Sequence, residues 1–181
     1  MALNVGCVAP DFEVDAAIGA ERIKWRLSEH LKEHHVLLVF HPLNWTPVCS
    51  LEARALNEAL PQLRAAGAEL IDLSTDHIFS HIAWQEFSVG SLQFPLGSDF
   101  YPHGEVARKY EILRTGDPLP GIPERAAFVI ERGTGIIRLA QIYHLGEQPD
   151  IQVLLEAVRQ LDGHANGECA GPELKMASGR D

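Results

Sequence analysis

The chain has 181 residues, of which 46% are hydrophobic, so its length fits one domain with a sizeable core. A formal net charge of −10 leaves no basic stripe to neutralise phosphates, which argues against nucleic acid as a partner. The longest apolar run is far shorter than a membrane span, and the N-terminus lacks the basic-then-apolar layout of a signal peptide. The three cysteines do not form the framework of a secreted disulfide-rich protein. We therefore expect a cytoplasmic protein that binds neither nucleic acid nor membrane.

The first part of the chain alternates short strands with helices. Residues 12–14 and 23–25 predict a hairpin, and Ser28 is expected to cap a brief helix before a buried strand at 36–40. A longer helix begins near Val48; Pro61 is expected to kink or restart it, and Gly67 to end it.

The second part continues the alternation and ends in a hairpin and a helix. The pattern predicts a buried strand at 70–74, helices at 79–89 and 106–110, strands at 126–131 and 136–143 around a turn at 132–135, and a closing helix at 151–161. Strands with intervening helices and a late hairpin indicate an α/β fold, with a mixed sheet and helices on both faces.

Cys49 stands where the buried strand and a proline-containing loop lead into the long helix. Only a thiolate attacks, and a free cysteine with a pKa near ~8.5 is mostly protonated at neutral pH. The unpaired N–H groups and positive dipole end of a helix N-terminus favour an anion. The alternative is a buried cysteine that fills core space, but Pro42, Thr46 and Pro47 just before it are not needed for that. We therefore predict that Cys49 is reactive.

The octet Pro42-Leu-Asn-Trp-Thr46-Pro-Val-Cys49 resembles the P-x-x-x-T/S-x-x-C signature of the peroxiredoxins, in the alkyl hydroperoxide reductase C and thiol-specific antioxidant branch. Five other stretches resemble family motifs in the same order, namely 5–12, 73–84, 94–99, 105–110 and 125–131. The resemblance implies a thioredoxin fold with a mixed central sheet flanked by helices. It also implies a peroxiredoxin domain over residues 1–160 and a C-terminal tail over 161–181.

The resemblance implies a thiol-dependent peroxidase that reduces hydrogen peroxide and organic hydroperoxides. Cys49 would be the peroxidatic nucleophile and become a sulfenic acid. Thr46 would hydrogen-bond the thiolate or the peroxide, although a helix cap is an alternative or additional role, and Pro42 would shield the sulfur from water. We expect no bound cofactor.

Arg125 opens a strand that is predicted to be buried, where a guanidinium is costly unless it meets an anion. The resemblance implies that it favours the thiolate and the charge on the leaving oxygen. The alternative is a surface arginine at a strand end. Glu52, one turn after Cys49, matches a glutamate that orients arginines in the family, and an exposed helical carboxylate is the alternative.

Cys169 lies in a segment, 163–172, that resembles the tail carrying a resolving cysteine in two-cysteine members. The resemblance implies homodimers, which in the family can assemble into rings, and an intersubunit disulfide opened by thioredoxin or a dedicated flavin disulfide reductase. Glu168 and Ala170 depart from the family's Val and Pro around this cysteine. Two alternatives therefore stay open: a one-cysteine enzyme recycled by an external thiol, and an oligomeric holdase or interaction protein. Cys7 is interpreted as a bystander.

Histidines give two further expectations. His41 stands where many family members carry tyrosine, so we expect pH-sensitive hydrogen bonding near the reactive cysteine. The pairs His30 with His34 and His77 with His81 have the i,i+4 spacing of helical metal ligands. Neither pair has an obvious third ligand nearby. We therefore expect these histidines to be packed or solvated side chains and to bind no metal.

Overall fold

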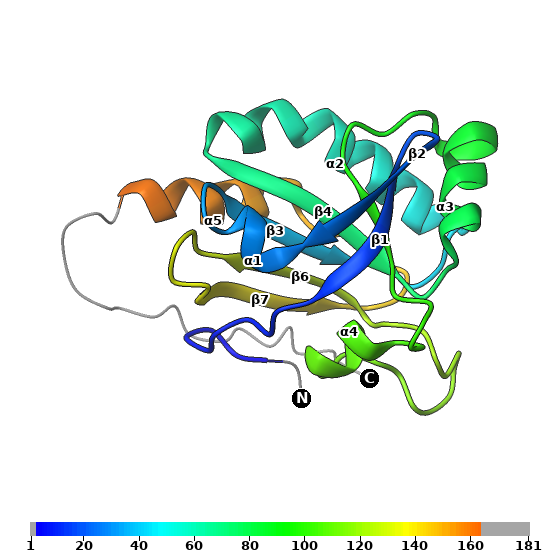
Figure 1. Ribbon diagram of the computed structural model, residues 1–181. Helices are drawn as coiled ribbons and strands as arrows, with labels where there is room; N and C mark the ends of the chain where they lie inside the picture. Colours follow the sequence, from blue (N-terminus) through cyan, green and yellow to red (C-terminus); the bar gives the residue numbers. More distant parts are fainter. Residues whose placement is uncertain (1–2, 164–181) are drawn as a thin grey trace.

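The computed structural model describes residues 3–163, which form a seven-stranded mixed sheet with helices on both faces (Figure 1). The strands are β1 (Glu13–Ile18), β2 (Glu21–Arg26), β3 (His35–Phe40), β4 (Ala68–Ser74), β5 (Leu96–Ser98), β6 (Arg125–Ile130) and β7 (Ile137–Tyr143). The helices are α1 (Leu27–His30), α2 (Pro47–Ala65), α3 (Ile78–Trp84), the π-helical turn η1 (Gln85–Val89), α4 (Glu105–Lys109) and α5 (Ile151–Gly163).

The strand order is β2-β1-β5-β4-β3-β6-β7, and every residue of β3 is buried between β4 and β6. Strand β3 runs parallel to β4 and antiparallel to β6. Phe40, the last residue of β3, therefore pairs with Leu73 near the end of β4 and with Ala126 near the start of β6. The loop after β3, the end of β4 and the start of β6 meet at one edge of the sheet.

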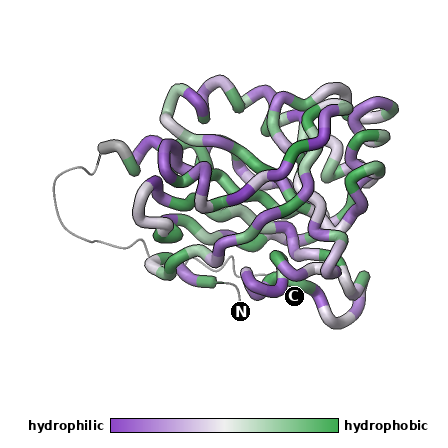
Figure 2. Tube along the Cα trace, viewed as in Figure 1, coloured by the Kyte–Doolittle hydropathy of each residue, from purple (hydrophilic) through white to green (hydrophobic). Residues whose placement is uncertain are grey.

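Hydrophobic side chains from both faces of the central strands form two core clusters. Leu37 and Val39 of β3 point to the face covered by α2 and α5, while Leu38 and Phe40 point to the face covered by α4 and the β1–β2 hairpin. Figure 2 shows hydrophobic residues in the central strands and mixed colouring along the outer helices. No helix within residues 3–163 is long and apolar enough to cross a membrane.

Most predicted elements are present, but Ser28 does not cap the first helix. Ser28 is the second residue of α1, and Arg26 occupies the cap position. The backbone N–H of Ser28 donates to Asp11 Oδ1, and its hydroxyl donates to Asp11 Oδ2. The capping acceptor thus comes from a residue distant in sequence, which local spacing did not indicate.

The helix does not restart at Pro61, because α2 continues through it to Ala65, and the alternative of a kink at this proline stays a prediction. Leu60 and Leu63, on either side of the proline, are both buried in the same core cluster. Tertiary packing therefore holds the two halves of the helix together despite the missing hydrogen bond. The helix predicted at 79–89 is present as α3 followed by η1.

Candidate active site

The N-terminus of α2 holds Cys49 at the sheet edge described above. Pro47 begins the helix, Thr46 occupies the cap position, and the carbonyl of Thr46 accepts from the N–H of Ser50. Cys49 is the third residue of the helix and only 1% exposed. The predicted position of this thiol at a helix N-terminus is confirmed.

Arg125 reaches the sulfur from the start of β6, across 76 positions of sequence. Its Nη2 donates to Cys49 Sγ at 3.2 Å and to the carbonyl oxygen of Leu145 at 3.0 Å. Its side chain is buried, so the surface-arginine alternative is wrong. A fixed positive charge therefore lies in direct contact with the sulfur in a site screened from water.

Glu52 completes this side of the site. Its carboxylate is buried and forms an ion pair with Nη1 of Arg125, so the exposed-carboxylate alternative is wrong. Because Glu52 lies one turn after Cys49 on α2, the same helix positions the thiol and the counter-ion of its arginine. Removing one member of such a pair strongly destabilises the fold, because the other charge is then left buried and uncompensated.

The loop before α2 contains the other two predicted site residues. Pro42 is buried beside the end of β3, and Thr46 is partly buried. The Thr46 hydroxyl donates to the carbonyl oxygen of Leu43 at 3.2 Å and makes no capping bond to the helix. The helix-cap alternative for this hydroxyl is therefore wrong, while its proposed contact with thiolate or peroxide stays a prediction.

His41, at the end of β3, adds a second buried polar cluster. Its Nδ1 lies 2.8 Å from Asp72 Oδ1, and its Nε2 lies 2.8 Å from Asn44 Oδ1. Burial opposes protonation, but the charge and hydrogen bond of Asp72 outweigh it and raise the pKa of His41 to about 9. Asp72 and Asn44 were not among the predicted site residues, although an aspartate inside a strand predicted to be buried is a signal for a buried charged partner.

Of the other cysteines and histidines singled out in the sequence, His81 joins the cluster around His41 through a contact with Asn44, whereas Cys7 and His30 lie elsewhere in the described structure. Cys7 is exposed as a free thiol, and Cys169 lies outside the described residues. His30 contacts Glu69 and stacks on Trp25 with ring centroids 4.3 Å apart. Among residues 3–163, no group of three or more His, Cys, Asp or Glu side chains is arranged to hold a metal ion.

Fold and site together define a class of protein. A buried cysteine at a helix N-terminus, in contact with a buried arginine on a thioredoxin-type sheet, is the arrangement of a thiol-dependent peroxidase.

Comparison with known proteins gives the family. Residues 5–140 match the AhpC/TSA family model, and the chain belongs to this family. It is 33% identical over 166 residues to a chloroplastic 2-cysteine peroxiredoxin of Chattonella marina var. antiqua, covering 89% of this chain and 80% of that protein. It is also 33% identical over 159 residues to alkyl hydroperoxide reductase E of Mycobacterium bovis, covering 88% and 98%. Reduced 2-Cys peroxiredoxin of Plasmodium vivax superimposes with a TM-score of 0.81 at 26% identity, over 88% of this chain and 82% of the other.

Proposed function

We propose that Cys49 is the peroxidatic residue of this thiol-dependent peroxidase and that it acts on hydrogen peroxide and organic hydroperoxides. The thiolate attacks one peroxide oxygen, an S–O bond forms, and the O–O bond breaks with its electron pair on the leaving oxygen. That oxygen takes up a proton and leaves as water or an alcohol, and the cysteine becomes a sulfenic acid. The 3.2 Å contact from Arg125 Nη2 to Cys49 Sγ is the observation that carries the proposal.

Arg125 stabilises charge at both ends of this reaction. Its guanidinium favours the thiolate before attack and the negative charge that grows on the leaving oxygen during it. Glu52 keeps the guanidinium in place and Pro42 shields the sulfur. We assign to the Thr46 hydroxyl, which donates to the carbonyl of Leu43 here, a hydrogen bond to the thiolate or the peroxide.

We assign the resolving step to Cys169 of a partner subunit in a homodimer. Its thiol attacks the sulfenic sulfur, water leaves, and an intersubunit disulfide forms; a dithiol reductant, thioredoxin or a flavin disulfide reductase, then reduces it. The names of the relatives as 2-Cys peroxiredoxins support this route. Recycling of a one-cysteine enzyme by an external thiol is the competing outcome.

Cysteine variants test both steps with a matched control. Cys49→Ser should abolish peroxide consumption, whereas a holdase would be unaffected. Cys169→Ser should consume one equivalent of peroxide, lose the dimer band on a non-reducing gel and stop thioredoxin-linked turnover. Cys7→Ser is the control and should behave as the unmodified chain, since Cys7 is an exposed free thiol whereas Cys49 is buried. Unchanged turnover of Cys169→Ser would contradict the resolving role.

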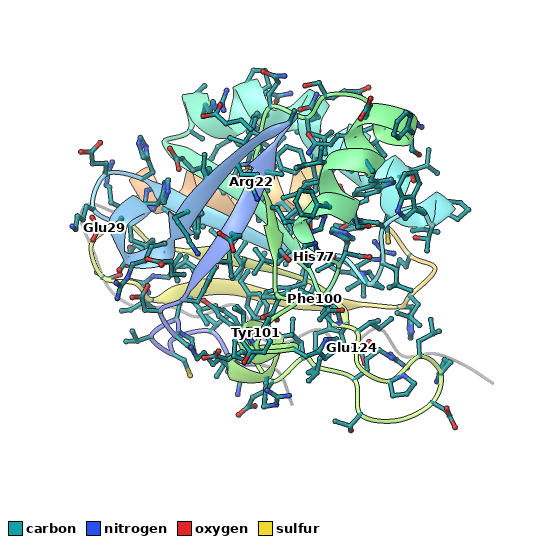
Figure 3. All side chains as sticks on the ribbon, turned by 45° about the vertical axis from the view of Figure 1, so that its right-hand side comes forward. Arg22, Glu29, His77, Phe100, Tyr101 and Glu124 are labelled. Carbon is teal, nitrogen blue, oxygen red and sulfur yellow. The ribbon has the colours of Figure 1, made fainter. Side chains whose placement is uncertain are left out.

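An exposed aromatic cluster supports association of two or more copies of the chain. His77 stacks on Phe79 and contacts Phe100 edge-to-face, and the Arg22 guanidinium lies over the ring of Phe79. Figure 3 shows Arg22, His77, Phe100 and the 88%-exposed Tyr101 along one side of the molecule. Exposed apolar surface of this kind is typical of protein interfaces. Sedimentation should give a dimer or larger assembly, and Phe79→Glu should weaken it; an unchanged assembly would contradict a role for this surface.

The remaining assignments concern location and organisation. We propose a reducing, cytoplasmic setting, no nucleic-acid or membrane partner, and a domain over residues 1–160 followed by a tail over 161–181. The acidic net charge of −10 and the three cysteines support the first two assignments. Cell fractionation of the source organism, followed by detection of this protein and of its thiol redox state in each fraction, tests the location.

A further inference from the structure

Three groups surround the guanidinium of Arg125, and one of them is a backbone carbonyl. Nη1 forms an ion pair with Glu52, whereas Nη2 donates to Cys49 Sγ at 3.2 Å and to the carbonyl oxygen of Leu145 at 3.0 Å. Among residues 3–163, neither Nε nor Nη1 has a hydrogen-bond partner. In this part of the chain, the carbonyl of Leu145 is therefore the one acceptor besides the sulfur that orients the N–H groups.

The two partners of the guanidinium restrain it in different ways. A guanidinium is planar, and each terminal nitrogen carries two hydrogens at fixed angles. Since one hydrogen of Nη2 points to the carbonyl of Leu145, the other is directed to Cys49 Sγ. The attraction of an ion pair depends on distance, whereas a hydrogen bond weakens steeply when the donor turns away from the acceptor. Glu52 thus keeps the positive charge near the sulfur, and Leu145 sets the direction of its N–H.

A four-residue turn after β7 presents this carbonyl. The N–H of Glu147 donates to the carbonyl of His144 at 3.0 Å, which closes the turn over residues 144–147. Neither Leu145 nor Gly146 has a positive φ, and among the common hydrogen-bonded turns this leaves type I. The second residue of a type I turn is in the right-handed helical region, which fixes the direction of its carbonyl.

Both ends of the connection that contains this turn are attached to the elements of the site. Before the turn, Tyr143 of β7 pairs with Arg125 of β6. After it, the carboxylate of Asp150 accepts from a backbone N–H in the first turn of α5 at 2.9 Å. Leu154 of α5 is buried in the same core cluster as Cys49. The fold therefore fixes the position of the turn relative to the arginine and the sulfur.

We propose that the carbonyl of Leu145 aims the guanidinium of Arg125 at Cys49, so that Leu145 is a positioning residue for the peroxidase reaction. The proposal rests on the peroxidatic role assigned to Cys49 above. Without this acceptor, Arg125 stays paired with Glu52 and the positive charge stays in the site. Its N–H, however, is no longer directed at the sulfur or at the leaving oxygen, and Cys49 reacts more slowly.

A proline at position 146 tests the alignment without removing a charged group. Proline forces the residue before it out of the right-handed helical region, so Gly146→Pro turns the carbonyl of Leu145 away from Arg125. Gly146→Ala is the matched control, because φ at this position is not positive and a Cβ there meets no atom within 4 Å.

We expect Gly146→Pro to slow two reactions of Cys49, alkylation by iodoacetamide at pH 6 and reduction of hydrogen peroxide. Each should slow about tenfold, the effect of losing a hydrogen bond to a charged group, while Gly146→Ala keeps both rates. Equal rates for the two variants would overturn the proposal. Slowed alkylation in Gly146→Pro, with no peroxide consumption by the unmodified chain, would instead overturn the proposed function.

The effect should also depend on the arginine. Gly146→Pro combined with Arg125→Met should slow alkylation of Cys49 no further than Arg125→Met alone, because no guanidinium is left to aim. A purely structural role of the turn would add the same slowing in both backgrounds, and that result would contradict the positioning role.

NMR of the full reduced chain tests the contact without any substitution. With isotope labels at the arginine nitrogens and the leucine carbonyl carbons, we expect a coupling across the hydrogen bond from Arg125 Nη2 to the carbonyl of Leu145. Separate signals for Nη1 and Nη2 should show that the guanidinium rotates slowly. A single averaged signal, or no coupling to Leu145, would overturn the proposal.

Discussion

Two buried cation–carboxylate pairs lie near the ends of the central strands, and they differ in what their cation can do. On one side, Arg125 pairs with Glu52 and touches the sulfur directly. On the other, His41 pairs with Asp72 and is connected to α3 through Asn44. A guanidinium keeps its charge at every pH at which the fold survives, whereas an imidazolium does not. The arginine side therefore supplies constant stabilisation, and the histidine side makes the stability of the fold depend on pH.

Removing the arginine should have the largest effect on catalysis. Arg125→Met is expected to lower the rate constant for peroxide reduction by about 100- to 1,000-fold, the usual loss when a donor to a developing oxyanion is removed. Stopped-flow fluorescence with hydrogen peroxide measures this. Arg138→Met, which removes an arginine paired with Glu131 away from the sulfur, is the control. A loss for Arg125→Met no larger than for the control would show that the contact with Cys49 has no catalytic importance.

Removing the charge of Glu52, the partner of Arg125, should mainly reduce the stability of the fold. Glu52→Gln leaves the guanidinium buried without its counter-ion, and we expect a loss of about 3 kcal/mol in the free energy of unfolding. The double variant Glu52→Gln, Arg125→Met should be less destabilised than the sum of the two single changes. Urea unfolding gives all three values, and strict additivity would contradict the coupling.

The contributions of His41 and His81 to folding stability should depend on pH in opposite directions. The folded-state pKa of His41 is raised to about 9, so its contribution is complete below pH 6.5 and is lost as pH rises through about 9. The folded-state pKa of His81 is lowered, so the unfolded chain binds the extra proton and stability falls as pH drops below 6.5. Urea midpoints from pH 5 to pH 9.5 should therefore pass through a maximum. His41→Phe should flatten the alkaline side and His81→Phe the acid side, and the reverse assignment would contradict the account.

The smallest expected effect comes from the loop hydroxyl. Thr46→Val removes a single hydrogen bond to the carbonyl of Leu43, which is worth about 1 kcal/mol of stability. If the hydroxyl also contacts thiolate or peroxide, the rate should fall while Thr46→Ser keeps it. Equal rates for Thr46→Val and the unmodified chain would limit Thr46 to a structural role.

The part of the site formed by Cys49 and Arg125 could be predicted from the sequence, because it depends on residue type and local position. Cys49 follows from a buried strand, a proline loop and a helix start, and Arg125 from the cost of a guanidinium in a buried strand together with the family resemblance. Glu52 was left between two alternatives, because helical spacing places it one turn from Cys49 but does not say whether that face is buried.

The histidine side could not be predicted in the same way. Asn44, Asp72 and His81 come from a loop, a strand and a helix, and only the parallel pairing of β3 with β4 and the packing of α3 bring them to His41. The wrong expectations have the same origin. The acceptor for the backbone N–H of Ser28 comes from the distant Asp11, and α2 does not restart at Pro61 because core packing holds the residues on both sides of it.

The central claim is that Cys49, in contact with Arg125, is oxidised by peroxide. Reduced full-length protein mixed with one equivalent of hydrogen peroxide, followed by intact mass and peptide mapping, tests it most directly. We expect consumption of one peroxide per chain and a disulfide from Cys49 to Cys169, and in Cys169→Ser a gain of about 16 Da on Cys49, the mass of a sulfenic oxygen. Peroxide consumption no faster than in Cys49→Ser, or oxidation found first on Cys7, would contradict the account.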